Sequence, residues 1–164
     1  MQQLERTRRY LDRIRRLYRG VPAEWDRRLE FEDDVYSFFV HCYHVRDWFF
    51  HLNKINLTEK ELEGFVEKHH ALRICADLCN GTKHCTLTKK LRTNDQPHLI
   101  GRKSVGHSEG IIPGQESILS SQFTIMSEGK QYDALEVAEA CMFAWDDLVK
   151  WLHANTPPDR LKEL

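Results

Sequence analysis

The sequence predicts a mainly α-helical protein, a four-helix bundle with a small β-hairpin inserted before the last helix. Apolar residues recur at helical spacing in four long segments. Between the third and the fourth segment, this pattern gives way to a Ser-, Thr- and Ile-rich run followed by a turn at 127–130. The chain has 164 residues, of which 41% are hydrophobic, so we expect one packed domain over 1–164.

The first predicted helix, within residues 1–20, carries seven arginines and ends at Gly20. Four of them recur at intervals of three and four residues and form a ridge on one face: Arg6, Arg9, Arg13 and Arg16. Such a ridge suits contacts with phosphate groups. The alternative, which we favour on the sequence alone, is a solvated face whose arginines pair with Glu30, Glu32, Asp33 and Asp34.

A central pair of helices is predicted over 31–80. The second helix of the chain spans about 31–52. The third helix begins at Thr58, because Thr58 and Glu61 form the Thr-x-x-Glu pattern of a capping box. We expect it to end at Asn80-Gly81, since glycine adopts the left-handed conformation of a helix C-cap at no steric cost.

Residues 85–133 are predicted to form a loop and the β-hairpin. Residues 85–88 alternate like a strand, 92–116 have the composition of a loop, and 118–126 form a strand that pairs with residues 131–132. The last helix is predicted over 134–154, with Asp133 as its N-cap. Its composition leaves little polar surface, so we expect it to be the most buried helix.

Charge and cysteine usage restrict the partners and the compartment. The net charge is −1, so no global field attracts nucleic acid. The chain has neither the apolar core of a signal peptide nor an apolar run of about 20 residues, and we expect no membrane partner. The five cysteines lack the spacing of a disulfide framework, which predicts reduced thiols in a cytoplasmic protein.

Polar residues gather on one face of the second predicted helix. At about 100° per residue, His44, Asp47 and His51 lie within roughly 60° of one another. Arg46 projects instead into the apolar arc of the same helix. An arginine in an apolar arc needs a partner or a route to solvent, so Arg46 marks a buried ion pair or a functional site.

The third predicted helix has a comparable polar stripe, formed by His69, Arg73, Asp77 and Asn80. If the two helices are antiparallel neighbours, Asp77 and Asn80 lie near His41, His44 or Arg46 of the second helix. A structural hypothesis follows: Asp77 pairs with Arg46 or Arg73 and fixes the register of the two helices. Asn80 then caps the helix and Lys83 offsets its dipole, whereas His84 has no structural explanation.

The stretches YHVRDWFF and DLCNGTKH, the predicted hairpin and the FAWDDLVKWL helix together resemble a group of uncharacterised bacterial helical-bundle proteins. The region 31–154 is also loosely similar to the HEPN superfamily of all-α bundles. Many HEPN proteins are ribonucleases of toxin–antitoxin and antiphage systems, use an Arg-x4-6-His motif and act as dimers. The resemblance implies RNA as a partner, a homodimer, and a role in bacterial defence or stress.

Arg46 and His51 match that motif as Arg-Asp-Trp-Phe-Phe-His. The resemblance implies a metal-independent ribonuclease in which His51 is the general acid or base, Arg46 holds phosphate, and Asp47 orients them. His84 is a further catalytic candidate, and the candidate binding residues are His44, Asp77, Asn80 and Lys83. Binding of RNA without cleavage is a second hypothesis. The alternative is a non-catalytic protein-interaction module whose polar cluster is structural.

Two sets of residues contain acceptable metal ligands. One is His44, Asp47 and His51, and the other is Cys75, Cys79, His84 and Cys85. Neither set has a known zinc spacing, and free cysteines are commonly small core residues. We therefore expect no metal ion or other cofactor.

Overall fold

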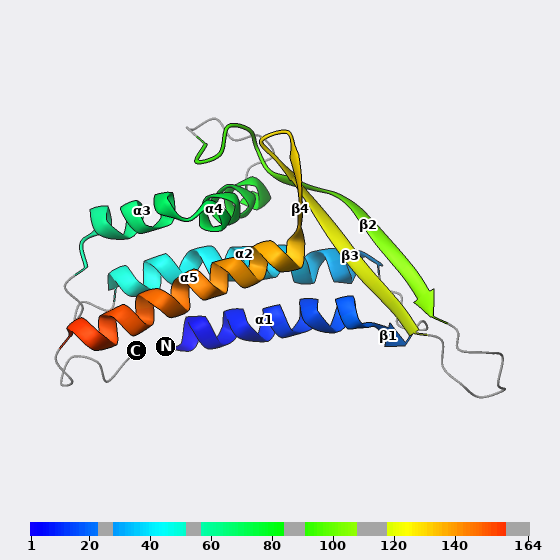
Figure 1. Ribbon diagram of the computed structural model, residues 1–164, viewed down its shortest axis with the longest axis horizontal. Helices are drawn as coiled ribbons and strands as arrows, with labels where there is room; N and C mark the ends of the chain where they lie inside the picture. Colours follow the sequence, from blue (N-terminus) through cyan, green and yellow to red (C-terminus); the bar gives the residue numbers. More distant parts are fainter. Residues whose placement is uncertain (23–27, 52–56, 84–90, 108–117, 157–164) are drawn as a thin grey trace.

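The computed structural model describes residues 1–22, 28–51, 57–83, 91–107 and 118–156 (Figure 1). Over these ranges the fold is mainly helical, with a small antiparallel sheet. The helices are α1 (Gln2–Arg19), α2 (Arg28–His51), α3 (Glu59–Lys68), α4 (His70–Lys83) and α5 (Ala134–Asn155). The strands are β1 (Val21–Pro22), β2 (His98–His107), β3 (Ile118–Ser127) and β4 (Lys130–Asp133).

The core lies where α2 packs against α1, α4 and α5. Figure 1 shows α1, α2 and α5 side by side, with α3 and α4 on the opposite side of α2 and α5 from α1. The largest fully buried side chains of the core are aromatic: Trp145, Phe38, Phe39, Phe49 and Phe123. Burial of each such side chain contributes about 1.5–3 kcal/mol, so these contacts fix how the helices pack. None of the described helices is long and apolar enough to cross a membrane.

Local capping signals predicted several helix ends correctly. The ends of α1 lie within one residue of the prediction, and the Thr58–Glu61 capping box is present at the start of α3. Asp133 caps α5 by accepting hydrogen bonds from the backbone N–H groups of Leu135 and Glu136. These caps satisfy N–H groups that have no partner within the helix.

The prediction of one continuous third helix is wrong, because the helix is interrupted at His69 and forms two helices, α3 and α4. The His69 backbone is extended there, and its N–H bonds the Val66 carbonyl at 3.1 Å. In a continuous helix, the His69 N–H would bond the Phe65 carbonyl. Here the Nδ1 atom of the His69 ring lies 2.8 Å from that carbonyl, and the His69 ring packs on the Phe65 ring. This side-chain contact replaces the lost helical hydrogen bond.

The predicted stop at Asn80-Gly81 is also wrong, because α4 continues to Lys83. Gly81 does not adopt a positive φ; in the described chain only Gly20 and Gly129 among the glycines do so. A Cβ atom at Gly81 would lie 3.2 Å from Nε2 of Gln96. Gly81 therefore permits the close approach of the Gln96 side chain, and Asn80 lies inside the helix instead of capping it.

The sheet is larger than the predicted hairpin. β3 is its central strand: β2 pairs antiparallel along one edge, while β1 and β4 pair with opposite ends of the other edge. The β3–β4 hairpin and its turn were predicted correctly, and Glu128 and Gly129 of the turn both have positive φ. The expected loop over 92–116 instead contains β2. The sequence of β2 does not show the alternation of buried and exposed residues that predicts a strand, because its apolar residues Ile100 and Val105 are both exposed.

Tyr18 joins α1, the sheet and α5. Its hydroxyl accepts a hydrogen bond from the Phe123 N–H at 3.0 Å, lies 3.1 Å from the Phe123 carbonyl, and also contacts Asp133 and the Leu135 N–H. Phe123 lies in the part of the β3 edge between the segments that β1 and β4 cover. Burial raises the pKa of Tyr18 to about 12, so the phenol stays protonated.

One further expectation is corrected. The helices do not form a clear four-helix bundle, because α3 and α4 replace the single third helix and the sheet packs against α1 and α5. α5 buries nine of its 22 residues and also has an exposed aromatic face, since Phe143 is 67% exposed and Trp151 is 54% exposed. Apolar composition alone does not separate a buried helix from one with an exposed aromatic face.

Candidate functional site

The predicted catalytic arginine, Arg46, lies in a cluster of charged side chains between α2 and α3. Its Nε and Nη2 atoms donate to Asp47 at 3.1 and 2.8 Å. Its Nη1 atom donates to the Tyr43 hydroxyl at 3.1 Å and to the Glu63 carboxylate. Every nitrogen of the guanidinium therefore has an acceptor within the protein.

A second arginine, Arg92, completes this cluster. Its guanidinium donates to Glu63 and Glu67, and the guanidinium carbons of Arg46 and Arg92 lie 5.1 and 6.0 Å from the centre of the Tyr43 ring. Burial alone would lower the pKa of both arginines, but hydrogen bonds to Asp47 and Glu63 and the neighbouring charges raise it. Both side chains stay charged, and Glu63 bridges them.

Asp77 is a buried carboxylate, 2% exposed, that holds the segment after α4. Its Oδ2 atom accepts hydrogen bonds from the Arg92 N–H, the Thr93 N–H and the Thr93 hydroxyl, each at 2.8 Å. By fixing this backbone, Asp77 places the Arg92 side chain against Tyr43 and Glu63. The carboxylate acts as an anchor for a loop.

The predicted ion pair from Asp77 to Arg46 or Arg73 is therefore wrong. Arg73 donates instead to the Arg92 carbonyl at 3.4 Å, and its Nε is buried without a hydrogen-bond partner. α4 packs on α2, and Asp77 is connected to Tyr43 of α2 through the backbone and the side chain of Arg92. No spacing in the sequence marks Arg92 or Glu63 as the missing partners.

Of the other candidates on α2, Asp47 belongs to this cluster, whereas His51 lies away from it. His51 is exposed at the end of the helix, and its ring contacts Phe50. Five residues on a helix turn the chain by about 500°, so Arg46 and His51 point roughly 140° apart. His44 is half-buried, with its ring 6.5 Å from that of Tyr43. Asp47 is held by Arg46.

The candidates at the end of α4 are only partly described. Asn80 is half-buried within the helix. Lys83 is the last residue of α4, which is the position expected of a cation that offsets the helix dipole, but its side chain lies outside the described residues. The predicted catalytic residue His84 and the thiol of Cys85 also lie outside them, as does the predicted strand over 85–88.

Neither predicted metal set forms a group of ligand atoms within the described ranges. The group that does form is Cys42, Cys75 and Cys141, whose sulfur atoms all lie within 4.8 Å of one another. Burial raises the pKa of Cys75 and Cys141 well above its ordinary value. Burial acts in the same direction on Cys42, but the neighbouring Cys141 and Cys75 thiols and the Trp145 N–H oppose it and lower that pKa.

The four-arginine ridge of α1 (Arg6, Arg9, Arg13 and Arg16) is exposed, and the expected pairing with acids of α2 is wrong for most of it. Arg13 pairs with Asp34 at 2.9 Å. Arg6 donates to the amide oxygen of Gln3. Arg9 and Arg16 form no ion pair with any residue that the structure describes. Within the described ranges, most of the charge of the ridge is therefore not neutralised by an acid.

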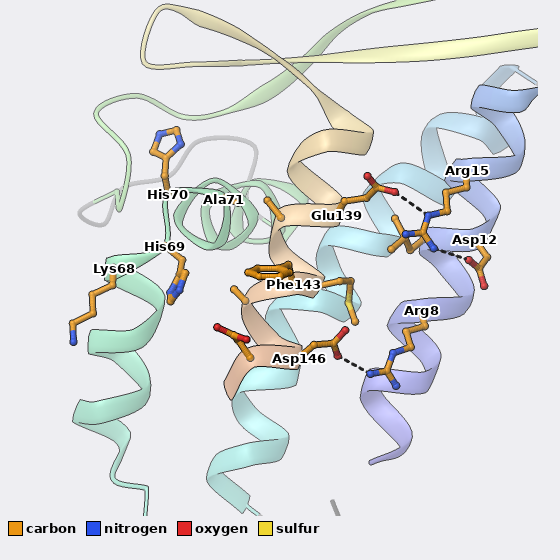
Figure 2. Close-up of a pocket in the computed structure, with 15 residues that line it drawn as sticks. Arg8, Asp12, Arg15, Lys68, His69, His70, Ala71, Glu139, Phe143 and Asp146 are labelled. Carbon is orange, nitrogen blue, oxygen red and sulfur yellow. Dashed lines mark hydrogen bonds and ion pairs between the residues drawn. The ribbon is translucent and has the colours of Figure 1, made fainter. Parts of the chain in front are cut away.

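The α1 arginines outside the ridge bind α5. Arg8 pairs with Asp146 at 2.6 Å, and Arg15 pairs with Glu139 at 3.0 Å (Figure 2). These pairs form one wall of a hollow beside α5 whose other wall is the junction of α3 and α4 at Lys68–Ala71. Figure 2 shows Phe143 on α5 between the two walls.

No protein-family model, no curated protein and no solved structure matches this chain.

Proposed function

We propose that the protein binds single-stranded RNA through the four-arginine ridge of α1. The observation that carries the proposal is that Arg9 and Arg16 have no carboxylate partner among the described residues. The acids of α1 itself, Glu5 and Asp12, are bound by Arg8 and Arg15 instead. Exposed guanidinium groups without counter-charges are the groups that nucleic-acid phosphates attract most strongly.

The length of the ridge suits an extended strand. At about 1.5 Å of rise per residue, Arg6 and Arg16 are separated by roughly 15 Å along the helix axis. Their guanidinium groups follow one face at intervals of three or four residues. A row of this length offers contacts to several successive phosphates and carries no base preference of its own.

A stacked pair of rings borders the ridge and supports the choice of a single strand. Tyr10 of α1 and His41 of α2 stack with centroids 4.9 Å apart at 26°, and Arg13 lies 4.8 Å from the centre of the Tyr10 ring. Burial lowers the pKa of His41, and the charges of Arg6 and His44 add to the effect. A neutral, half-exposed ring pair beside cations is the kind of platform on which unpaired bases stack.

The proposal is for binding without cleavage. The candidate phosphate ligand Arg46 already has acceptors on all of its nitrogens, and His51 lies on another face of α2. Cleavage by Arg46 and His51 in a HEPN-like manner stays a prediction. Such cleavage requires Arg46 to leave Glu63 and Asp47 and to bind phosphate instead. The contacts with phosphate must then offset the loss of two charge-assisted contacts.

The affinity for a fluorescent single-stranded RNA tests the proposal. We expect Arg9→Gln/Arg16→Gln to bind about 25-fold more weakly than the wild type at 0.1 M salt, because the loss of each phosphate contact lowers the affinity about fivefold. The control is Lys60→Gln/Lys130→Gln, which changes the net charge equally at exposed positions on α3 and β4. Equal weakening by both pairs would contradict the proposal.

The same reactions report on cleavage. We expect the RNA to remain intact after incubation with the wild type. RNA that is cut by the wild type and not by His51→Ala would contradict binding without cleavage and would establish the ribonuclease hypothesis. Cutting that persists in His51→Ala would indicate a contaminating nuclease or another catalytic residue, and would remove His51 from consideration.

A second candidate function, the non-catalytic protein-interaction module, is supported by Phe143. This ring has the highest exposure of the large apolar side chains in the described chain, and it lies beside a hollow that Leu11, Met142 and Ala144 help to line. In a two-fold symmetric dimer, a protruding ring next to a hollow can enter the hollow of the other copy. The partner in this candidate is therefore a second copy of the chain.

Light scattering at micromolar concentrations tests the dimer. We expect the wild type to have the mass of a dimer and Phe143→Ser to have the mass of a monomer, because a polar side chain at the centre of an apolar contact removes its main driving force. Phe50→Ser is the control, since Phe50 is also exposed but lies at the end of α2. A monomeric wild type would contradict this candidate.

A further inference from the structure

Three helices each direct one cysteine to the same point in the core. Cys42 comes from α2, Cys75 from α4 and Cys141 from α5. All three residues are 0% exposed, and their sulfur atoms lie within 4.8 Å of one another. Sulfur atoms bound to one metal ion at about 2.3 Å are separated by roughly 4 Å. The three thiols are therefore spaced so that small side-chain shifts place them around one ion.

The surroundings of the three sulfurs contain few competing groups. The Nε1 atom of Trp145 is buried without a hydrogen-bond partner in the described chain, and the indole N–H near Cys42 lowers the pKa of that thiol. The Cys75 thiol donates to the Phe39 carbonyl at 3.3 Å. No histidine or carboxylate of the described chain joins the three sulfurs as a ligand. The site thus offers three sulfur donors and one N–H group to balance negative charge.

We propose that Cys42, Cys75 and Cys141 bind a single soft metal ion in a three-coordinate site, and that Cu(I) is the ion that fits. Thiolate sulfurs select Cu(I) and Zn²⁺. Structural Zn²⁺ almost always takes four ligands, whereas this group supplies three. On binding, the thiols that become ligands release their protons to solvent, and no electron is transferred. The low charge of Cu(I) leaves a net negative site, which the Trp145 N–H partly offsets.

The simpler explanation is that the three cysteines are small apolar side chains that fill the core and bind nothing. That account explains their burial but gives no reason for three sulfurs to converge from three helices. It also leaves the buried indole N–H of Trp145 without a hydrogen-bond partner in the described chain. A metal ion bound here would join α2, α4 and α5, so binding is expected to raise the temperature of unfolding.

Anaerobic titration of the reduced protein with Cu(I), held by a coloured competing chelator, tests the proposal. We expect the wild type to remove one Cu(I) per chain and to gain thermal stability. Cys42→Ala, Cys75→Ala and Cys141→Ala should each bind at least about 100-fold more weakly, because two sulfurs no longer close the site. Cys79→Ala is the matched control, since Cys79 is also a buried cysteine of α4 but is not among the three clustered sulfurs.

Four outcomes would overturn the proposal: no uptake of Cu(I) by the wild type, unchanged binding in all three variants, equal loss in Cys79→Ala, or tighter binding of Zn²⁺ than of Cu(I). If an alanine variant does not fold, X-ray absorption of the loaded wild type decides. We expect three Cu–S distances near 2.3 Å. A first shell dominated by nitrogen or oxygen would contradict the assignment.

Discussion

Asp77→Ala is expected to lower the free energy of unfolding by about 3 kcal/mol. The substitution removes the one carboxylate oxygen that accepts from the N–H groups of Arg92 and Thr93 and from the Thr93 hydroxyl. A buried N–H or O–H group that loses its acceptor is still removed from water, but no hydrogen bond compensates for the lost hydration. The loss also frees the segment that positions Arg92 against Glu63. Urea unfolding followed by circular dichroism measures the change.

Two matched variants separate this anchor from a general effect of lost charge. Asp77→Asn keeps an amide oxygen as an acceptor, so we expect it to cost about half as much as the alanine variant. Asp34→Ala removes a more exposed carboxylate that pairs with Arg13, and we expect it to cost less than about 1 kcal/mol. A change below about 1 kcal/mol for Asp77→Ala would show that the carboxylate is not the anchor of this loop.

Tyr18→Phe is expected to lower the free energy of unfolding by about 2 kcal/mol. The phenol hydroxyl bonds the N–H and the carbonyl of Phe123 on β3 and also accepts from the Leu135 N–H at the start of α5. Its removal leaves these Phe123 groups without that partner, whereas the Leu135 N–H keeps its bond to Asp133. Tyr36→Phe is the control, because Tyr36 also packs against the core but its hydroxyl makes no hydrogen bond to the described chain. Equal effects of the two substitutions would contradict this role of Tyr18.

The dependence of stability on pH gives a second readout for Tyr18. Burial raises its pKa from 10.0 to about 12 in the folded protein. The folded state therefore holds this proton more tightly than the unfolded state between pH 10 and 12. The stability from the protonated phenol is fully present below pH 10 and is lost as the pH rises towards 12. We expect Tyr18→Phe to lose less stability than the wild type over this interval.

Elements that depend on near neighbours could be predicted from the sequence. The Thr58 cap, the Asp133 cap and the ends of α1 follow from residues within one helical turn of each other, and the structure contains them. The Glu128–Gly129 turn is local in the same way. In each case the groups that satisfy the backbone are adjacent in the chain, so composition and spacing are enough to identify them.

Features that depend on distant partners could not be predicted. The break at His69 is stabilised by a histidine side chain on a carbonyl, in a stretch that contains neither proline nor glycine. The partners of Asp77 come from a segment 15 and 16 residues later. β2 is formed by pairing with β3, and its own side chains show little periodic burial. Such contacts leave no fixed spacing in the sequence.

The same limit applies to the candidate sites. The sequence identified Arg46 and Asp77 as polar residues that need partners, but it assigned the wrong partners because Arg92 and Glu63 carry no distinguishing pattern. It identified the arginine ridge as exposed but assigned it acids of α2 as partners, of which only Asp34 pairs with a ridge arginine among the described residues. The convergence of Cys42, Cys75 and Cys141 depends on how three helices pack and has no signature along the chain.

The salt dependence of RNA binding tests the central claim, that the ridge of α1 contacts phosphate, most directly. The logarithm of the affinity should fall linearly with the logarithm of the salt concentration, with a slope of about −0.7 for each phosphate contact to a single strand. We predict that Arg9→Gln/Arg16→Gln reduces the magnitude of this slope by about 1.4, whereas Lys60→Gln/Lys130→Gln leaves it unchanged. The same slope for the wild type and the arginine variant would contradict the account.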